Sequence, residues 1–124
     1  MKKKYTIRLI YSLIILSCLS CTDIFETDIS GSSVELLAPV DSLTTKSNYQ
    51  VFWWNYLNGA LWYELQVVSP SFSAVSSLNM DTLIEKNNFQ LTLQPGVYHW
   101  RVRALNGSST TGYTENVLNI SDTI

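Results

Sequence analysis

The sequence of 124 residues predicts an all-β protein, a single seven-stranded sandwich that follows an export signal. Two observations support this fold class, and a third indicates the export signal. Apolar and polar residues alternate with a period of two from Val34 onward. Clusters of Gly, Pro, Asn and Ser, typical of turns, separate these short runs. The first twenty residues instead place basic, apolar and small residues in the order of a secretory signal.

The N-terminal segment, MKKKYTIR, contributes half of the eight basic residues and is followed by the apolar run LIYSLIIL. Small residues and both cysteines come next, in LSCLSCTD. The apolar run is too short to cross a bilayer as a helix, which needs roughly 20 apolar residues. We therefore expect residues 1–20 to be a signal peptide that is removed on export.

Cys18-Leu19-Ser20-Cys21 resembles the lipobox of bacterial lipoproteins, which implies acylation of Cys21 and a lipid anchor in the outer membrane. The surface and the periplasmic side of that membrane both remain open. Ile15-Leu16-Ser17-Cys18 gives an alternative register, with acylation at Cys18, and cleavage without lipid is a third reading. Residues 21–33 would then be the lipidated cysteine and a flexible tether, because TDIFETDISGSS is polar and acidic.

Removal of the signal makes the domain acidic, because all ten carboxylates remain with four basic residues, a balance near −6. Nucleic acids are poor partners for such a domain, since phosphate neutralisation dominates their binding. No cysteine follows Cys21, so the fold is expected to lack a disulfide. The stability of the domain must then come from its hydrophobic core.

Seven runs are expected to form strands: 34–38, 49–54, 61–68, 74–85, 89–93, 97–104 and 114–120. Pro39 and Ser69-Pro70 end two of these runs, because proline has no N–H to donate to a neighbouring strand. Lys86-Asn87-Asn88 and Asn106-Gly107 mark turns. Residues 34–121 form the predicted domain, and residues 122–124 form a tail.

The run LQPGVYHWRVRA resembles the fibronectin type III pattern, in which an L-x-P-G-x-Y stretch precedes the sixth strand. The resemblance covers residues 34–121 and implies a tyrosine corner formed by Leu93, Pro95, Gly96 and Tyr98. Trp54 and Tyr63 match the second-strand tryptophan and third-strand tyrosine of that family. The fibronectin type III pattern and the lipobox together make the chain similar to fibronectin type III-like lipoproteins of the Bacteroidota. Most of those proteins are of unknown function.

Alternation divides the 97–104 strand into two faces, with Tyr98, Trp100, Val102 and Ala104 toward the core. His99, Arg101 and Arg103 are therefore expected on the outer face. Antiparallel pairing with the 61–68 strand would place Trp62 near Arg103, Glu64 near Arg101 and Gln66 near His99. Such pairs could simply form a solvated ladder over the sheet.

The same residues are also the best candidates for a contact surface. Exposed Trp and Arg are enriched at binding hot spots, and an indole ring suits the face of a sugar. Trp62, His99, Arg101 and Arg103 are the candidates on the sheet, and Tyr56 is the candidate in the 55–60 loop. Trp53 is expected to point outward from the opposite sheet.

Asp41-Ser42-Leu43, Asp81-Thr82-Leu83 and Asp122-Thr123-Ile124 resemble the O-glycosylation triplets of exported Bacteroidota proteins. The resemblance makes Ser42, Thr82 and Thr123 candidate glycosylation sites. A chain rich in Ser and Thr also produces such triplets by chance.

No nucleophile elbow, phosphate-binding loop or metal-ligand spacing occurs, and the chain has one histidine. We expect a monomeric, non-catalytic module that needs no cofactor or metal. It would bind a glycan or an envelope protein while its lipid anchor holds it in the membrane. A structural spacer, or an assembly subunit of an outer-membrane complex, is the alternative.

Overall fold

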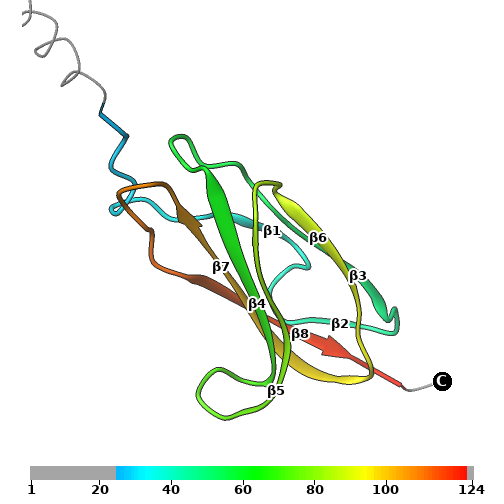
Figure 1. The fold of residues 1–124 in the computed structure, drawn as a ribbon. Coiled ribbons are helices and arrows are strands. Elements are labelled where there is room, and N and C mark those ends of the chain that lie inside the picture. The colour runs from blue at the N-terminus through cyan, green and yellow to red at the C-terminus, as the bar shows by residue number, and fades with distance from the viewer. Residues whose placement is uncertain (1–24, 123–124) are drawn as a thin grey trace, which may run out of the picture.

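A computed structural model describes residues 25–122, which form a sandwich of two β-sheets (Figure 1). Eight strands follow one another along the chain, and this part contains no helix. They are β1 (Leu36–Ala38), β2 (Leu43–Thr45), β3 (Tyr49–Trp54), β4 (Trp62–Pro70), β5 (Val75–Ile84), β6 (Asn88–Thr92), β7 (Gly96–Leu105) and β8 (Thr114–Ile120). The predicted all-β class is confirmed, and the predicted count of seven strands is wrong.

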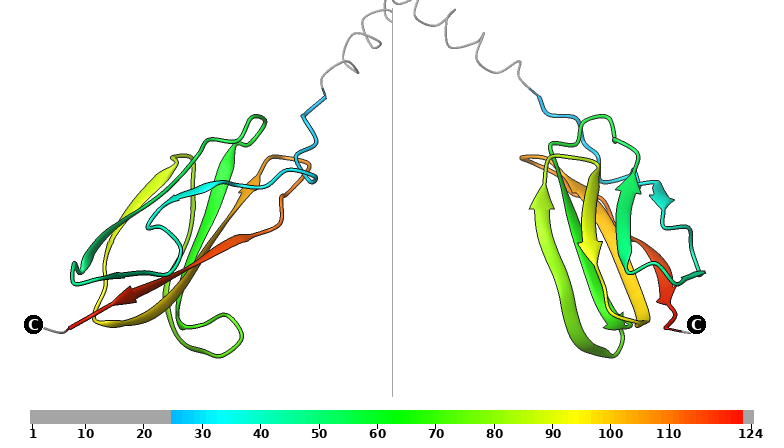
Figure 2. Two further views of the ribbon diagram at one scale, coloured as in Figure 1. Left: turned by 180° about the vertical axis from the view of Figure 1, so that it is seen from behind. Right: turned by 90° about the vertical axis from the view of Figure 1, so that its right-hand side faces the viewer.

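The smaller sheet has the order β1-β3-β6 and the larger has the order β2-β8-β7-β4-β5. All neighbours are antiparallel except β2, which pairs in parallel with β8. The N-terminal end of the described chain lies at one end of the sandwich and residue 122 at the other (Figure 2).

The extra strand is β2, which the sequence did not reveal. It has only three residues, and their pattern is too short to show a period of two. Its position depends on contacts with β8: Asp41 Oδ1 accepts the Val117 N–H at 2.8 Å, and the Ser42 N–H donates to the Val117 carbonyl at 2.8 Å. Ser42 has a φ of 64°, which turns the chain into β2.

The core lies between the sheets and is built from the strand faces that alternation predicts. Its largest fully buried side chains include Trp54, Trp100, Tyr63 and Phe52. The Phe52 and Trp100 rings meet edge to face with centroids 5.0 Å apart. Each such side chain contributes about 1.5–3 kcal/mol by leaving water.

The tight turn before β7 fixes how that strand enters the sheet. The Tyr98 hydroxyl donates to the Gln94 carbonyl at 2.6 Å, the backbone bond expected of a tyrosine corner. Leu93 is buried, and Gly96 has a φ of 158°. Pro95 lies between Gln94 and Gly96 in this turn.

Residues 26–30, which we name the strap, pack against the sandwich. Ile29 is 1% exposed and belongs to the core. The Asn106 side-chain amide donates to the Thr27 carbonyl at 2.7 Å, and Glu26 Oε2 accepts the Gly107 N–H at 2.7 Å. Residues 26–30 of the segment predicted as a tether thus contact the domain: the Ile29 side chain enters the core, and the Thr27 carbonyl and the Ile29 N–H have partners on it.

The predicted signal peptide, which contains Cys18, and the predicted lipidation site Cys21 lie outside the described residues. Within residues 25–122, no helix is long and apolar enough to span a bilayer.

Candidate functional site

The outer face of the larger sheet contains most of the residues that the sequence singled out. Alternation along β4 and β7 places Glu64, Gln66, His99, Arg101 and Arg103 there, and we call this set the charged face. All five are half-buried.

The expected pairing of the two strands was wrong by two residues. Arg103 lies opposite Glu64, Arg101 lies opposite Gln66, and His99 lies opposite Val68. Trp62 is half-buried and lies opposite Leu105, rather than near Arg103. The physical reason is that alternation determines only the face of each side chain, and a shift of two residues leaves every face unchanged.

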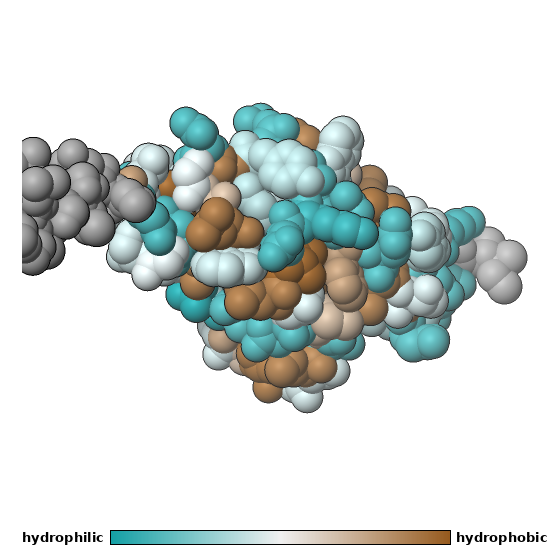
Figure 3. All heavy atoms as spheres, turned by 45° about the horizontal axis from the view of Figure 1, so that its top comes forward, coloured by the Kyte–Doolittle hydropathy of each residue, from teal (hydrophilic) through white to brown (hydrophobic). Residues whose placement is uncertain are grey.

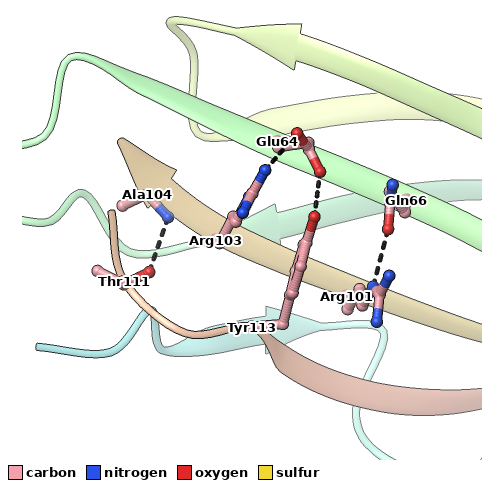
Figure 4. A network of polar contacts seen from close by, with 7 residues as sticks. All are labelled: Glu64, Gln66, Arg101, Arg103, Ala104, Thr111 and Tyr113. Carbon is pink, nitrogen blue, oxygen red and sulfur yellow. Dashed lines mark hydrogen bonds and ion pairs between the residues drawn. The ribbon is translucent and has the colours of Figure 1, made fainter. Parts of the chain in front are cut away.

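The Arg101 guanidinium contacts two aromatic rings. Its central carbon lies 4.0 Å from the centroid of Phe72 and 4.0 Å from that of Tyr113. Arg101 Nε also donates to Gln66 Oε1 at 2.8 Å (Figure 4). The cation is therefore already in contact with two aromatic rings of the same chain.

Glu64 lies at the centre of the second group on this face. Arg103 Nη2 donates to Glu64 Oε2 at 3.1 Å, and the Tyr113 hydroxyl donates to Glu64 Oε1 (Figure 4). The Arg103 guanidinium lies 4.8 Å from the Tyr113 ring. Burial, and then the hydrogen bond to Glu64, raises the pKa of Tyr113 to about 12.

His99 forms the third group, with β8. Its Nδ1 lies 2.7 Å from Glu115 Oε2. The two side chains are 23% and 42% exposed, so water competes with this contact. The bond gives His99 a positioned carboxylate partner on the neighbouring strand.

Three residues of this face, Phe72, Tyr113 and Glu115, were not among the candidates. Glu115 shares the outward parity of the 114–120 strand, so alternation could have identified it. Tyr113 precedes that strand by one residue and continues the same parity. Phe72 comes from the β4–β5 loop, where no periodic pattern indicates a direction.

Tyr56 lies on the β3–β4 loop, at the strap end of the molecule. It is 66% exposed, and its ring centroid lies 6.2 Å from that of Tyr63. Polar and apolar side chains are interspersed when the molecule is seen toward this end (Figure 3). Tyr56 belongs to a loop, whereas the charged face is formed by β4 and β7.

The smaller sheet has an exposed apolar face, of which only Trp53 was expected from the sequence. Tyr49, Val51 and Trp53 alternate along β3 and are 57%, 39% and 46% exposed. We call them the aromatic stripe. On β6 the stripe lies beside Thr92, Gln90 and Asn88, which are uncharged hydrogen-bonding residues. Trp53 points outward from the smaller sheet, whereas Trp62 belongs to the larger sheet.

The glycosylation candidates lie in different settings. Ser42 is exposed at the turn before β2. Thr82 is half-buried and lies opposite the core residue Leu65, on the inner face of β5. Thr123 lies outside the described residues. Among residues 25–122, no group of three or more His, Cys, Asp or Glu side chains is placed to hold a metal ion.

No protein-family model and no curated protein matches the sequence. The similar solved structures include two domains. "Structure of FN3tt mut" has 21% identity and a TM-score of 0.46, over 68% of this chain and 83% of that chain. "Solution structure of the fibronectin type-III domain of human fibronectin type III domain containing protein 3" has 15% identity and a TM-score of 0.43, over 73% and 87%. Likenesses at this level do not place the chain in a family, and the architecture rests on its own strand pairing.

Proposed function

We propose that this chain is a non-catalytic binding module of the fibronectin type III kind, anchored in the outer membrane by lipid on Cys21. Its ligand is a glycan or an envelope protein, with a neutral glycan favoured. The observation that supports binding is the aromatic stripe, where two aromatic side chains and a valine remain exposed on one sheet face. Contiguous apolar patches on a soluble domain mark interaction sites more often than isolated residues do.

The chemistry of the stripe suits a sugar better than a charged ligand. Tyr and Trp rings can stack on the C–H face of a pyranose, and they present a polar group at the ring edge. Gln90 and Asn88 lie opposite Val51 and Trp53 and offer amide donors and acceptors to hydroxyls. No formal charge lies among the six residues of the stripe and its β6 neighbours.

The charged face is less suited to a ligand, because its cations are already engaged. Arg101 contacts two aromatic rings, and Arg103 is paired with Glu64. A ligand that displaced these contacts would have to replace a cation–π interaction of about 0.5–2 kcal/mol for each ring. We therefore assign this face to the stability of the sheet.

The binding test is a screen of the full chain against neutral and acidic polysaccharides, followed by variants. We expect Trp53→Ala and Tyr49→Ala each to weaken binding at least tenfold. Tyr56→Ala removes a more exposed aromatic side chain from another surface and should leave the affinity unchanged. Loss of binding in Tyr56→Ala alone would move the ligand to the loop. Absence of glycan binding by the wild type would exclude the glycan.

Anchoring has its own test. The mature protein from the membrane fraction should have the mass of a chain that begins at acylated Cys21, and Cys21→Ala should abolish that form. An acylated chain that begins at Cys18 would correct the register. Protease treatment of intact cells then distinguishes the two sides of the membrane, because only a surface-exposed domain is removed.

The alternative function, a spacer or an assembly subunit, is favoured by the strap. The strap joins the N-terminal side of the domain firmly to the β7–β8 loop, which would hold a partner at a defined distance from the membrane. Co-purification with one envelope complex, combined with no ligand in the screen, would support it.

A further inference from the structure

The longest unpaired sheet edge of the described chain belongs to β5. Four strands end a sheet, and they have three residues in β1, three in β2, five in β6 and ten in β5. β5 is hydrogen-bonded to β4 on one side only. An unpaired edge of this length is a template for another strand.

The two irregularities of β5 lie at Asn79 and nearer its N-terminus, so residues 80–84 form a regular edge with little of the usual protection. β5 contains no proline and one charged residue, Asp81. Val75, Leu78 and Leu83 on this strand are 51%, 61% and 56% exposed. A cavity of about 530 Å³ next to its C-terminal end is lined by Ile84, Glu85, Lys86, Asn88, Phe89 and Gln90. Ile84 and Phe89, which pack against the core, are therefore reached from this edge.

We propose that, in place of the monomer expected from the sequence, β5 pairs antiparallel with β5 of a second copy of this chain, about a two-fold axis at Thr82. In this register Thr82 lies opposite Thr82 of the second copy, and Met80 lies opposite its Ile84. Asp81 lies opposite Leu83 of the second copy. Two five-stranded sheets would then become one continuous ten-stranded sheet.

Charge selects this register from its neighbours. An axis at Asp81 would place two Asp81 carboxylates opposite each other, and an axis at Leu83 would place Asp81 opposite Glu85. Like charges directly opposite each other are destabilising. An axis at Met80 or earlier would include Asn79 in the paired segment. Asn79 is an irregularity of β5, since Met80 pairs with Val67 and Leu78 pairs with Val68 on β4. The axis at Thr82 avoids both problems.

The side chains agree with the same register. Met80, Thr82 and Ile84 lie opposite Val67, Leu65 and Tyr63, which are core residues, so they share the inner face. Pairing within one face keeps the apolar Met80 and Ile84 together on both sides of a Thr–Thr pair, a favourable cross-strand combination. The second copy would thereby cover the edge from which Ile84 and Phe89 are reached.

The two-fold axis makes the contact closed, because the same edge is used by both copies and no further copy can add. It does not depend on the lipid anchor or on a glycan ligand. Glycosylation of Thr82 would block it, because the modified side chain lies at the axis.

The test is cysteine cross-linking of the full chain in membranes from expressing cells. In the proposed pair the two Thr82 Cβ atoms lie about 4.5–5.5 Å apart, which is close to disulfide distance. Thr82→Cys should give a covalent dimer on a non-reducing gel after mild oxidation, at least tenfold above Thr44→Cys on the opposite edge. The wild-type chain, treated alike, accounts for Cys18 and Cys21.

A second pair of variants tests the register without disturbing the inner face. Leu83→Glu, added to Thr82→Cys, places a carboxylate opposite Asp81 of the second copy and should lower the yield at least fivefold. Leu83 also lies opposite Glu64 of the same chain, so urea denaturation of this variant must match that of Thr82→Cys. Asp81→Lys added to that variant should restore it. The proposal is overturned by equal dimer from Thr44→Cys, by no dimer, by a cross-link to a protein of different mass, or by no effect of Leu83→Glu.

Discussion

Gly59 allows the strap to lie against the β3–β4 loop. Its φ is 91°, and a Cβ at this position would lie 3.0 Å from both Ile29 Cγ2 and Thr27 Cβ. Gly59→Ala should therefore lower the free energy of unfolding by at least about 1–2 kcal/mol, from the backbone conformation alone. Urea denaturation measures this change. Gly31→Ala is the control, because nothing lies within 4 Å of its added Cβ, and a similar loss there would contradict the explanation.

The raised pKa of Tyr113 predicts that the stability of the domain falls at alkaline pH. Burial and Glu64 raise its pKa to about 12, compared with ~10 for a tyrosine in an unfolded chain. The folded state holds this proton more tightly, so the contribution to stability is complete below about pH 10 and is lost as the pH rises toward 12. Burial also raises the pKa of Tyr98, with the same sign.

Unfolding measured between pH 9 and 12 should show this loss, and it should be smaller in Tyr113→Phe. Absorbance of the phenolate at alkaline pH provides an independent titration. A Tyr113→Phe chain with the same pH dependence as the wild type would contradict the assignment.

At the scale of elements, the strap behaves as part of the domain rather than as a linker. Ile29→Ala should lower the free energy of unfolding by about 2–5 kcal/mol, because it leaves a cavity in the core. Chemical denaturation of the full chain measures the loss. Phe25→Ala, at a residue that is 86% exposed, should change stability by less than about 0.5 kcal/mol. Equal effects of the two variants would show that the strap is not docked.

The β4–β5 loop is held over the charged face by Phe72. Phe72→Ala removes one of the two rings on Arg101, which should cost about 0.5–2 kcal/mol and release the loop. Hydrogen exchange of the amides at 71–74 should become faster, while exchange in β7 stays unchanged. Val75→Ala, at an exposed residue after the loop, is the matched control. Unchanged loop exchange in Phe72→Ala would mean that the stack does not hold it.

For the whole molecule, stability should be independent of reductant. No cysteine follows Cys21, so no disulfide can join the strands of the domain. The thermal unfolding midpoint of the membrane-purified protein should be the same with and without dithiothreitol. A shift of several degrees would require a covalent bond that involves Cys18 or Cys21.

The alternation of residues was enough to predict the all-β class, most strand positions and the face on which each side chain lies. Successive side chains of a strand point to opposite faces, so this information is local and needs no partner strand. Trp100, Val102 and Ala104 were expected in the core for this reason, and they are buried there. Arg101 and Arg103 were expected outside it, and they lie on the charged face.

The partners of those side chains needed the three-dimensional arrangement, because a shift of two residues preserves every face and changes every contact. Arg103 therefore meets Glu64 and Tyr113, and Arg101 meets Gln66 and Phe72. The β2 strand and the strap are stabilised by residues 75 or more positions away, such as Val117 and Asn106. The local sequence pattern determines the face to which a side chain points. The register of the strands and the packing of β2 and the strap depend on contacts between distant segments.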